Sequence, residues 1–406
     1  MGGSLVRRGV IAAGLAVLTL APALQPAGAT SAAAPAPRAP KPRWAAQIDR
    51  LVRGLPVGVS VRDEGQDLYR HAAARPRTPA SNEKLLLSMA LLDVLGPEAV
   101  LLTQAATAAS PASGIVAGDL WIVGSGDPDV RASTMRLLAQ RISNTGVTRV
   151  EGSVLGNTGY FKRDWFAPGW KRDFPRSQVA LPTALTFEGN QAGGVHVRDP
   201  ELRAARALRR ELRELGVSVA GPAGSGKAPP GLIPVAEIAS DPLAELLDTM
   251  NRYSSNFWAE VLGKRLGVET TGQPGSIAKG ASAIRGYAAG RGIDVRARDG
   301  SGLSYSNRVS PRGLTRLLDT AEDATWGEAL REALPEPGQG TLSGRLRHVR
   351  VHAKTGTLTS ISALSGYVWL RRTSSWASFS ILARMSKDRA VRLEDRIVRI
   401  LWRRAA

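Results

Sequence analysis

The chain has 406 residues, no cysteine and a formal net charge of +19, and 43% of its residues are hydrophobic. This composition excludes a disordered chain, and the length predicts two lobes or one domain with an insertion. The lack of cysteine excludes disulfide bonds, thiol catalysis and thiolate metal sites. Such a charge attracts polyanions, which for an exported protein are anionic wall polymers and lipid headgroups before nucleic acid; an arginine-rich composition without a binding role is the alternative. The sequence contains no nucleic-acid-binding module.

Residues 1–29 are typical of a signal peptide: two arginines, an uncharged run and a small-residue cleavage site that ends at Ala29. We expect cleavage after Ala29 and an exported protein, either secreted or associated with the cell wall. A membrane anchor is the alternative, but the run is too short to span a bilayer and contains Pro22. The mature chain is therefore expected to have no transmembrane span, and the Ala/Pro-rich residues 30–43 to form a leader.

The main domain is expected to begin with residues 44–103. Residues 85–95 are apolar on nearly every side, which predicts a buried helix that ends at Gly96. Residues 104–234 are predicted to form a smaller inserted lobe, with strands at 118–123 and 147–150 around a helix at 134–142. No Pro/Gly cluster marks the end of this lobe.

Residues 235–406 are predicted to complete the main domain. The sequence predicts two helices at 241–250 and 257–266, then strands at 349–353, 364–370 and 376–383, and a final basic helix at 389–404. This last helix is amphipathic, and its apolar residues Ile397, Leu401 and Trp402 are expected to cover the sheet rather than a membrane surface.

Three short motifs occur in a fixed order: Ser81-Asn82-Glu83-Lys84, Ser254-Ser255-Asn256 and Lys354-Thr355-Gly356. The pattern Ser-x-x-Lys alone is expected by chance about 0.7 times in such a chain, and it does recur at Ser276. All three motifs in this order are expected in only a few of about a thousand such chains. Ser276 follows one glycine and its lysine precedes another, so it is expected to be a loop residue.

Ser81 is the predicted nucleophile because it stands at the start of the apolar helix, where the helix dipole favours a developing negative charge. Lys84 lies one helical turn later, within reach of the Ser81 hydroxyl, and is its predicted base. An ordinary lysine is almost always charged at neutral pH. We therefore expect burial and a second ammonium group, that of Lys354, to lower the pKa of Lys84.

The other motif residues have predicted roles around this pair. Ser254 is expected to relay a proton between the two lysines, and Asn256 to bind a substrate carbonyl. The strand that begins at Lys354 is expected to pair with a peptide-like substrate, which Gly356 allows to approach closely. The predicted substrate-binding residues are Thr355, Gly356, Thr357 and Thr359. The backbone N–H groups of Ser81 and Thr357 form the predicted oxyanion hole.

Together with the stretches 299–304 and 307–311, these motifs resemble the class C low-molecular-mass penicillin-binding proteins, a family of D-alanyl-D-alanine carboxypeptidases and endopeptidases. The resemblance implies an α+β transpeptidase-like fold, an antiparallel sheet with helices on both faces, with a smaller lobe inserted between the first and second motifs. It implies hydrolysis of peptidoglycan peptides through an acyl-enzyme on Ser81, without a cofactor, and covalent inhibition by penicillins and other β-lactams. Tyr305 stands where members often carry an arginine near the substrate's side-chain end. Because only 173 residues separate Ser81 from Ser254, one inserted lobe is expected to be reduced.

Four other features of the sequence suggest different functions. His348 and His352 have the spacing of helical metal ligands, but the residues between them favour a strand, so no metal site is expected. Residues 221–227 resemble a phosphate loop, but Ala228 replaces the hydroxyl residue that binds magnesium. No Glu-x-x-Leu-Asn stretch is present for a class A β-lactamase. A catalytically weak or inactive homologue that binds the wall through its basic surface remains the alternative function.

Overall fold

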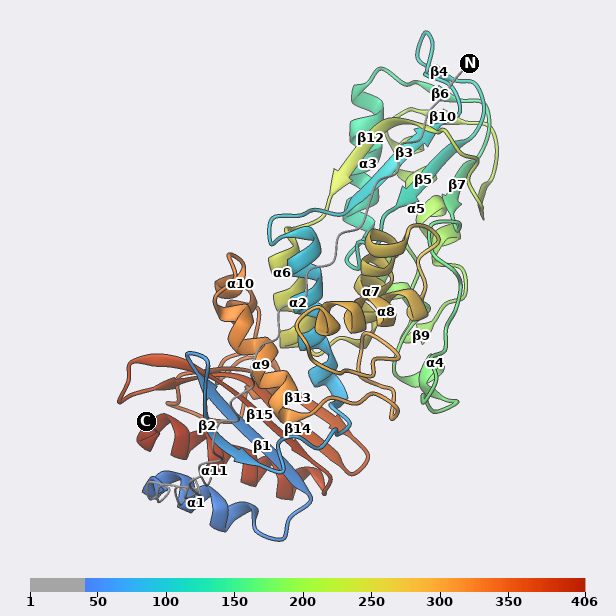
Figure 1. The fold of residues 1–406 in the computed structure, drawn as a ribbon. Helices are drawn as coiled ribbons and strands as arrows, with labels where there is room; N and C mark the ends of the chain where they lie inside the picture. Colours follow the sequence, from blue (N-terminus) through green and yellow to red (C-terminus); the bar gives the residue numbers. More distant parts are fainter. Residues whose placement is uncertain (1–40, 406) are drawn as a thin grey trace, which may run out of the picture. The chain divides into compact units, whose positions relative to one another are not determined.

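The computed structural model describes residues 41–405 (Figure 1). The predicted signal peptide and residues 30–40 of the predicted leader lie outside this range. Helix α1 (Arg43–Val52) begins at the last residue assigned to the leader. Within residues 41–405, no helix combines the length and the apolar character needed to cross a membrane.

A five-stranded antiparallel sheet joins the two ends of the described chain. Its order is β13 (Val351–Leu358), β14 (Ile361–Leu370), β15 (Ser375–Ala383), β1 (Val57–Asp63) and β2 (Gln66–His71). Strand β1 pairs with β15, so that Val57 lies opposite Ala383. β14 is buried over most of its length because helices cover both faces of the sheet.

The helix α11 (Lys387–Arg404) packs with α1 against one face of this sheet (Figure 1). Ile397 and Leu401 are fully buried in the shared core, which confirms the prediction that this amphipathic helix covers the sheet. Helix α9 (Pro311–Glu322) contacts the opposite face, over β1 and β15. The predicted antiparallel sheet with helices on both faces is therefore confirmed.

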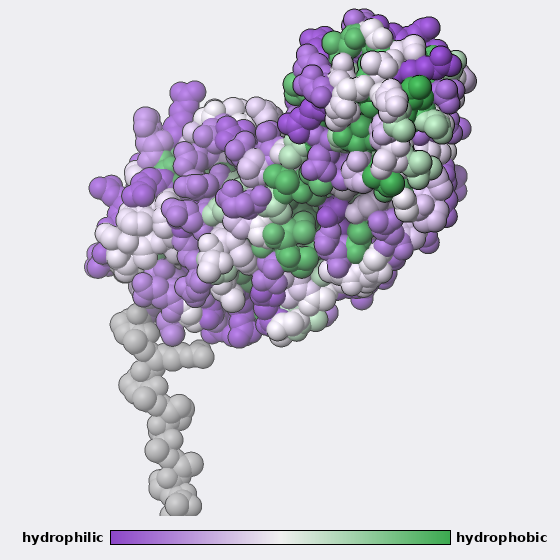
Figure 2. Space-filling view, turned by 90° about the horizontal axis from the view of Figure 1, so that it is seen from above, coloured by the Kyte–Doolittle hydropathy of each residue, from purple (hydrophilic) through white to green (hydrophobic). Residues whose placement is uncertain are grey.

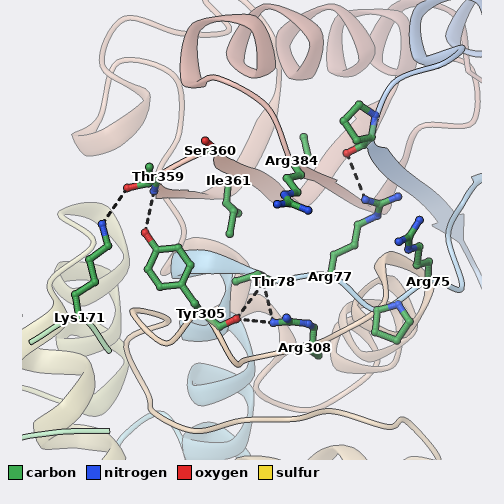
Figure 3. Close-up of a pocket in the computed structure, with 13 residues that line it drawn as sticks. Arg75, Arg77, Thr78, Lys171, Tyr305, Arg308, Thr359, Ser360, Ile361 and Arg384 are labelled. Carbon is green, nitrogen blue, oxygen red and sulfur yellow. Dashed lines mark hydrogen bonds between the residues drawn. The ribbon is translucent and has the colours of Figure 1, made fainter. Parts of the chain in front are cut away.

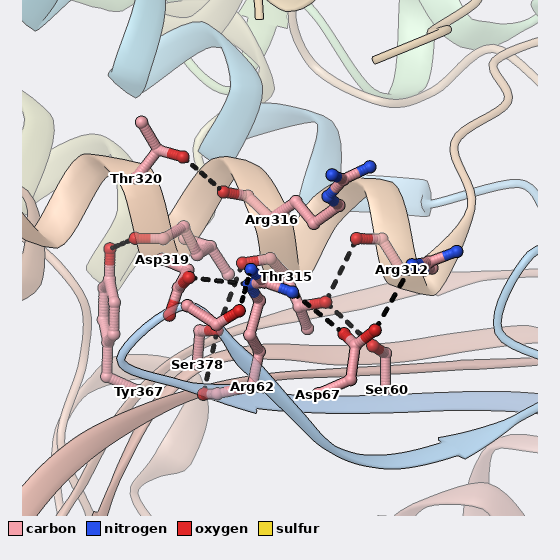
Figure 4. Close-up of polar contacts among 12 residues, drawn as sticks. Ser60, Arg62, Asp67, Arg312, Thr315, Arg316, Asp319, Thr320, Tyr367 and Ser378 are labelled. Atoms are coloured by element: carbon pink, nitrogen blue, oxygen red, sulfur yellow. Dashed lines mark hydrogen bonds and ion pairs between the residues drawn. The ribbon is translucent and has the colours of Figure 1, made fainter. Parts of the chain in front are cut away.

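Polar side chains connect α9 to β1 and β2 (Figure 4). Arg62 donates from Nε to Asp319 at 2.7 Å and from Nη1 to Asp67 at 3.1 Å. Nearby, the hydroxyls of Ser60 and Thr315 share a buried hydrogen bond of 2.8 Å. Because the Arg62–Asp319 and Ser60–Thr315 contacts join residues more than 250 positions apart in the sequence, they tie the late helix α9 to the first strand of the domain.

Replacing Asp319 by alanine should lower the free energy of unfolding by about 2 kcal/mol, because it leaves the largely covered Arg62 without its closest charged partner. Only 16% of each of these two side chains is exposed. Urea unfolding of the purified protein measures the effect. Alanine at the exposed Asp294 is the control and should change the value by less than about 0.5 kcal/mol; an equal change in both variants would contradict the assigned contact.

A second core lies between the sheet and a group of helices. These are α2 (Glu83–Leu95), α6 (Leu243–Arg252), α7 (Asn256–Thr271), α8 (Ile277–Ala289) and α10 (Gly327–Glu332). Every residue of α2 from Glu83 to Leu92 is buried, as the predicted all-round apolar helix requires. Ser276, the serine of the second Ser-x-x-Lys pattern, was expected to be a loop residue. It is the N-cap of α8 and accepts a hydrogen bond from the Lys279 N–H, so the helix that follows it was not predicted.

The inserted lobe is built on a mixed sheet with the order β11 (Ala223–Gly226), β7 (Val154–Asn157), β5 (Leu120–Gly124), β3 (Leu102–Thr107) and β12 (Ile233–Ala239). Helices α3 (Ala132–Asn144) and α5 (Pro200–Glu214) share its core. The entering strand β3 pairs with the leaving strand β12, so that Leu102 lies opposite Ala239. We therefore propose residues 102 and 239 as the limits of the lobe, five residues beyond the expected end at 234.

Short elements complete the lobe and the loops. The strands β4 (Ile115–Val116), β6 (Arg149–Val150) and β10 (Ser218–Val219) form a small sheet, and β8 (Gln191–Ala192) pairs with β9 (Val195–His196) near α4 (Phe174–Ser177). Single 3₁₀ turns are η1 (Ala80–Asn82), η2 (Glu188–Asn190) and η3 (Gly340–Leu342). Hydrophilic side chains cover most of the face shown in Figure 2, where hydrophobic residues gather mainly across the centre.

Candidate active site

Ser81 lies in the 3₁₀ turn η1, directly before α2 begins. Lys84 is in the first turn of α2, and its Nζ donates to the Ser81 hydroxyl at 3.4 Å. The three-residue spacing therefore places ammonium and hydroxyl on the same side of the chain. This geometry fits a nucleophile and its base.

The turn that carries Ser81 is held from two sides. Asn82 donates from its amide to the Lys354 carbonyl at 2.7 Å, which ties the turn to β13. On the other side, Gly302 lies so close that a Cβ atom there would meet the Ala80 carbonyl oxygen at 2.0 Å. Ala80 itself has a φ of 48°, a left-handed conformation that is strained for alanine. Neighbouring segments thus fix the backbone just before the nucleophile.

Lys84 is fully buried, and its Nζ also donates to the Asn256 Oδ1 at 2.9 Å and to the Ser301 carbonyl at 2.6 Å. Burial lowers the pKa of Lys84 to about 8, against the opposite effect of nearby carboxylates. The structure assigns the lowered pKa to burial rather than to Lys354. The predicted repulsion acts on the other partner, because burial and the charge of Lys84 hold the pKa of Lys354 well below its usual value.

Three buried carboxyl groups surround Lys84, and the sequence analysis missed them. Glu83, Glu260 and Asp299 are each at most 1% exposed. Burial raises the pKa of Glu83 well above its usual value, and burial together with Asp299 raises that of Glu260 to about 8. Asp299 accepts hydrogen bonds from the Trp170 indole and from the backbone of Gly302. One sequence feature could have indicated them: Glu83 is an acidic residue at the start of a helix that is otherwise almost entirely apolar.

The second motif lies where α7 begins. Ser255 caps this helix by accepting from the Trp258 N–H, which places Asn256 in the first turn, within reach of Lys84. The Asn256 amide nitrogen donates to the Gln178 carbonyl at 3.3 Å. Ser254 has a φ of 55°, and among residues 41–405 its hydroxyl has no hydrogen-bond partner. Its proton relay between the lysines therefore stays a prediction, as does the binding of a substrate carbonyl by Asn256.

The third motif lies on β13, at the edge of the main sheet. Lys354 is fully buried and donates from Nζ to the Thr355 carbonyl at 3.0 Å. At Gly356 a Cβ atom would lie 3.0 Å from the Ser81 nitrogen and 2.9 Å from the Pro79 carbonyl. Only glycine therefore lets β13 approach the nucleophile turn without displacing it.

β13 is an edge strand, and after Ala353 its outer edge is open to an added peptide strand. The Ala353 N–H donates out of the sheet to the Pro335 carbonyl. Because alternate residues of a strand point their N–H groups to the same edge, those of Thr355 and Thr357 face outward too. The side chains of Thr357 and Thr359 are exposed. Thr355 and Thr357, the latter the predicted oxyanion donor, thus lie on one strand, and Thr359 comes directly after its end.

The structure shows the local conformation of the phosphate-loop-like stretch and of one of the two spaced histidines. Residues 223–226 form β11, which pairs in parallel with β7 instead of leading into a helix. His352 lies on β13, where it contacts Glu336 at 3.0 Å. Residues 41–405 contain no group of three or more His, Cys, Asp or Glu side chains placed to hold a metal ion.

A helix-start serine with a lysine one turn later, beside the edge strand of an antiparallel sheet, defines a serine acyl-transfer enzyme of the penicillin-binding fold. The chain belongs to the D-Ala-D-Ala carboxypeptidase 3 (S13) family, whose model matches residues 45–193 and 190–404. The predicted family and fold are confirmed. The protein is therefore a serine-type D-Ala-D-Ala carboxypeptidase. The alternative function, a non-catalytic wall-binding protein, is not favoured.

Two relatives and one solved structure illustrate the match. The D-alanyl-D-alanine carboxypeptidase of Actinomadura sp. (strain R39) is 28% identical over 79% of this chain and 76% of its own length. Carboxypeptidase DacB of Mycolicibacterium smegmatis is 30% identical over 78% of this chain and 73% of its own. Penicillin-binding protein 4 of Haemophilus influenzae has the same fold, with a TM-score of 0.76 at 21% identity over 87% of this chain and 99% of its own. That protein has also been solved in complex with a β-lactam.

Proposed function

We propose that this carboxypeptidase cleaves the terminal D-alanine from peptidoglycan stem peptides through an acyl-enzyme on Ser81. The observation that carries the proposal is the convergence of Ser81, Lys84, Asn256 and Lys354 beside the open edge of β13. A stem peptide that adds to this edge as an extra strand presents its D-Ala-D-Ala bond to Ser81.

The reaction proceeds in two transfers. Neutral Lys84 takes the hydroxyl proton of Ser81 while Oγ attacks the carbonyl carbon of the penultimate D-alanine. The N–H groups of Ser81 and Thr357 stabilise the oxyanion. The C–N bond then breaks, the departing D-alanine amine takes up the proton, and water hydrolyses the ester in the reverse sense. A β-lactam acylates Ser81 in the same way as the first transfer. Its leaving amine belongs to the opened ring and stays attached to the acyl group, so the ester is hydrolysed slowly.

Three finer assignments belong to the same proposal. Endopeptidase activity requires that the leaving amine belong to a second stem peptide, which the open edge accommodates. Action outside the cytoplasm is supported by the signal-like residues 1–29. Association with anionic wall polymers is supported by the net charge of +19.

The assay uses a defined pentapeptide and a cross-linked muropeptide dimer. We expect D-alanine to be released from the pentapeptide, and intact-mass spectrometry to show one covalent adduct with penicillin. Cleavage of the dimer at a rate within about tenfold of D-alanine release would establish endopeptidase activity; no cleavage of either substrate and no adduct would refute the proposed function.

A further inference from the structure

The last helix of the chain, α11, carries a row of arginines along its outer side. Arg389, Arg392, Arg396, Arg399 and Arg403 follow one another at intervals of three and four residues. At about 100° per residue, these five positions fall within about 80° of the helix circumference. Four of the side chains are exposed and that of Arg399 is partly exposed. These five residues are called the α11 arginine row below.

The opposite side of α11 is used for packing. Its apolar residues are buried in the core that the helix shares with α1 and the main sheet: Ala390, Leu393, Ile397, Val398 and Leu401. Their positions are centred about 150° around the helix from the arginine row. The fold therefore fixes the row so that it faces away from the sheet.

The protein does not neutralise the charge of this row. Within residues 41–405, no carboxylate forms an ion pair with any of its five arginines. Glu394 and Asp395, which lie between them in the sequence, pair with Arg345 instead, each at 2.8 Å. Like charges three and four residues apart destabilise a helix. An anionic partner that lies along the row removes this repulsion.

Positive charge continues at both ends of the row. Helix α11 begins at Lys387 without a side-chain cap, so the unpaired N–H groups of its first turn add a partial positive charge. At the other end, the guanidinium groups of Arg371 and Arg403 lie 5.3 and 5.8 Å from the centre of the Trp402 ring. From Arg389 to Arg403 the row is about 21 Å long. Its shape suits an extended ligand.

The row is separate from the other basic surface of the protein, the pocket beside the turn between β13 and β14 (Figure 3). That pocket opens beside Tyr305 at the end of the substrate strand and belongs to the active site; no residue of α11 lines it. Near the start of the row, however, Arg392 lines a pocket of about 490 Å³ together with Thr355 and Thr357 of β13. A ligand along the row therefore ends close to the substrate strand.

We propose that the α11 arginine row binds a linear phosphodiester polymer of the cell wall. The inference rests on the proposed function, because it assumes that the enzyme works at the wall. A polymer with one phosphate per short repeat carries its charges at intervals similar to the rise between successive arginines, about 5 Å. Its binding releases condensed counterions, which favours association. The row would thus hold the enzyme on the wall with its substrate strand near the stem peptides.

An anionic membrane surface fits α11 less well than such a polymer. A helix that binds a bilayer buries its apolar side among the lipids. In α11 that side is already buried in the protein core, and Ile400 and Trp402 are only partly exposed. A flexible polyanion needs only the arginines.

The test measures binding of poly(glycerol phosphate) at several salt concentrations. With about −0.7 per phosphate contact, five contacts predict a slope of about −3.5 for the logarithm of the binding constant against that of the salt concentration. The triple variant Arg396→Gln/Arg399→Gln/Arg403→Gln should reduce the slope to about −1.4 and weaken binding in low salt at least about tenfold. These three arginines lie outside the pocket that Thr355 and Thr357 line.

The matched control removes the same charge from exposed positions on α5 and α9, as Arg206→Gln/Arg213→Gln/Arg316→Gln. It should keep the slope and bind within about threefold of the unmodified protein, because distant charges are screened by salt. Circular dichroism should show that both triple variants are folded. Both should also release D-alanine from a soluble pentapeptide and form the penicillin adduct like the unmodified protein.

Three results would overturn the polymer site. They are no binding of poly(glycerol phosphate) by the unmodified protein, an equal loss of binding in the two triple variants, and a row variant that loses only its binding to phosphatidylglycerol vesicles. The second result would assign the binding to net charge alone, and the third would assign the row to a membrane surface. Failure of the proposed function looks different: the unmodified protein releases no D-alanine and forms no adduct, whether or not it binds the polymer.

Discussion

Replacement of Ser81 by alanine is expected to abolish the penicillin adduct and to lower kcat/KM for D-alanine release by about 10⁴- to 10⁶-fold. Among residues 41–405, Ser81 carries the only hydroxyl that accepts a hydrogen bond from the Lys84 Nζ, at 3.4 Å. Losses of this size are typical when the nucleophile of an acyl-transfer enzyme is removed. Intact-mass spectrometry after incubation with penicillin, and a D-alanine release assay, measure the two effects.

The chain provides its own control in the second Ser-x-x-Lys motif. Ser276 caps α8 instead of facing Lys84, so Ser276→Ala should lose about 1 kcal/mol of folding stability and keep both labelling and activity. If Ser81→Ala still formed the adduct, or if Ser276→Ala lost it, the nucleophile would be assigned to the wrong motif.

Replacement of Lys84 by methionine is expected to lower kcat/KM by about 10³-fold, because it removes the general base but keeps an unbranched side chain of similar length. The control is Lys279→Met, the lysine of the second motif, whose Nζ donates to the Gly272 carbonyl at 2.6 Å and does not touch Ser81. Circular dichroism should show that both variants are folded. Comparable activity in both would remove Lys84 from the mechanism.

The same lysine predicts a pH profile. Burial lowers the pKa of Lys84 to about 8, and only its neutral form accepts the Ser81 proton. The acylation rate should therefore rise about tenfold per pH unit below pH 8 and level off above it. Penicillin acylation, followed by stopped flow from pH 6 to 10, measures this directly, and Lys84→Met should lose the rise. A rate independent of pH over this range would contradict a base with that pKa.

The sequence predicted those parts of the fold that local patterns determine. Helix α2 was found because its residues are apolar on every side, and α11 because its apolar residues form one stripe. Helix α8 was missed because glycines in and around residues 277–289 suggested a loop. The end of the inserted lobe was placed at 234 because β12 is largely exposed and contains Pro234, which hides its strand character.

The motifs located the reactive residues but not the environment that tunes them. Glu83, Glu260 and Asp299 are up to 216 positions apart, and only the packing of α2 against α7 and the 299–304 loop brings them to Lys84. The hydrogen bond from Lys84 to Asn256 likewise depends on where α7 begins. Such contacts between distant segments leave no periodic trace in the sequence.

The open edge of β13 has a consequence for the solution behaviour of the protein. An unpaired strand edge is also a template for a strand of a second copy, and exposed edges of this kind promote self-association. The pocket beside this edge is lined by five cationic side chains, those of Arg75, Arg77, Lys171, Arg308 and Arg384, and the net charge is +19. Two copies should therefore repel each other where they would otherwise pair. This repulsion should disfavour pairing of β13 with the same strand of a second copy and leave the edge free for a peptide.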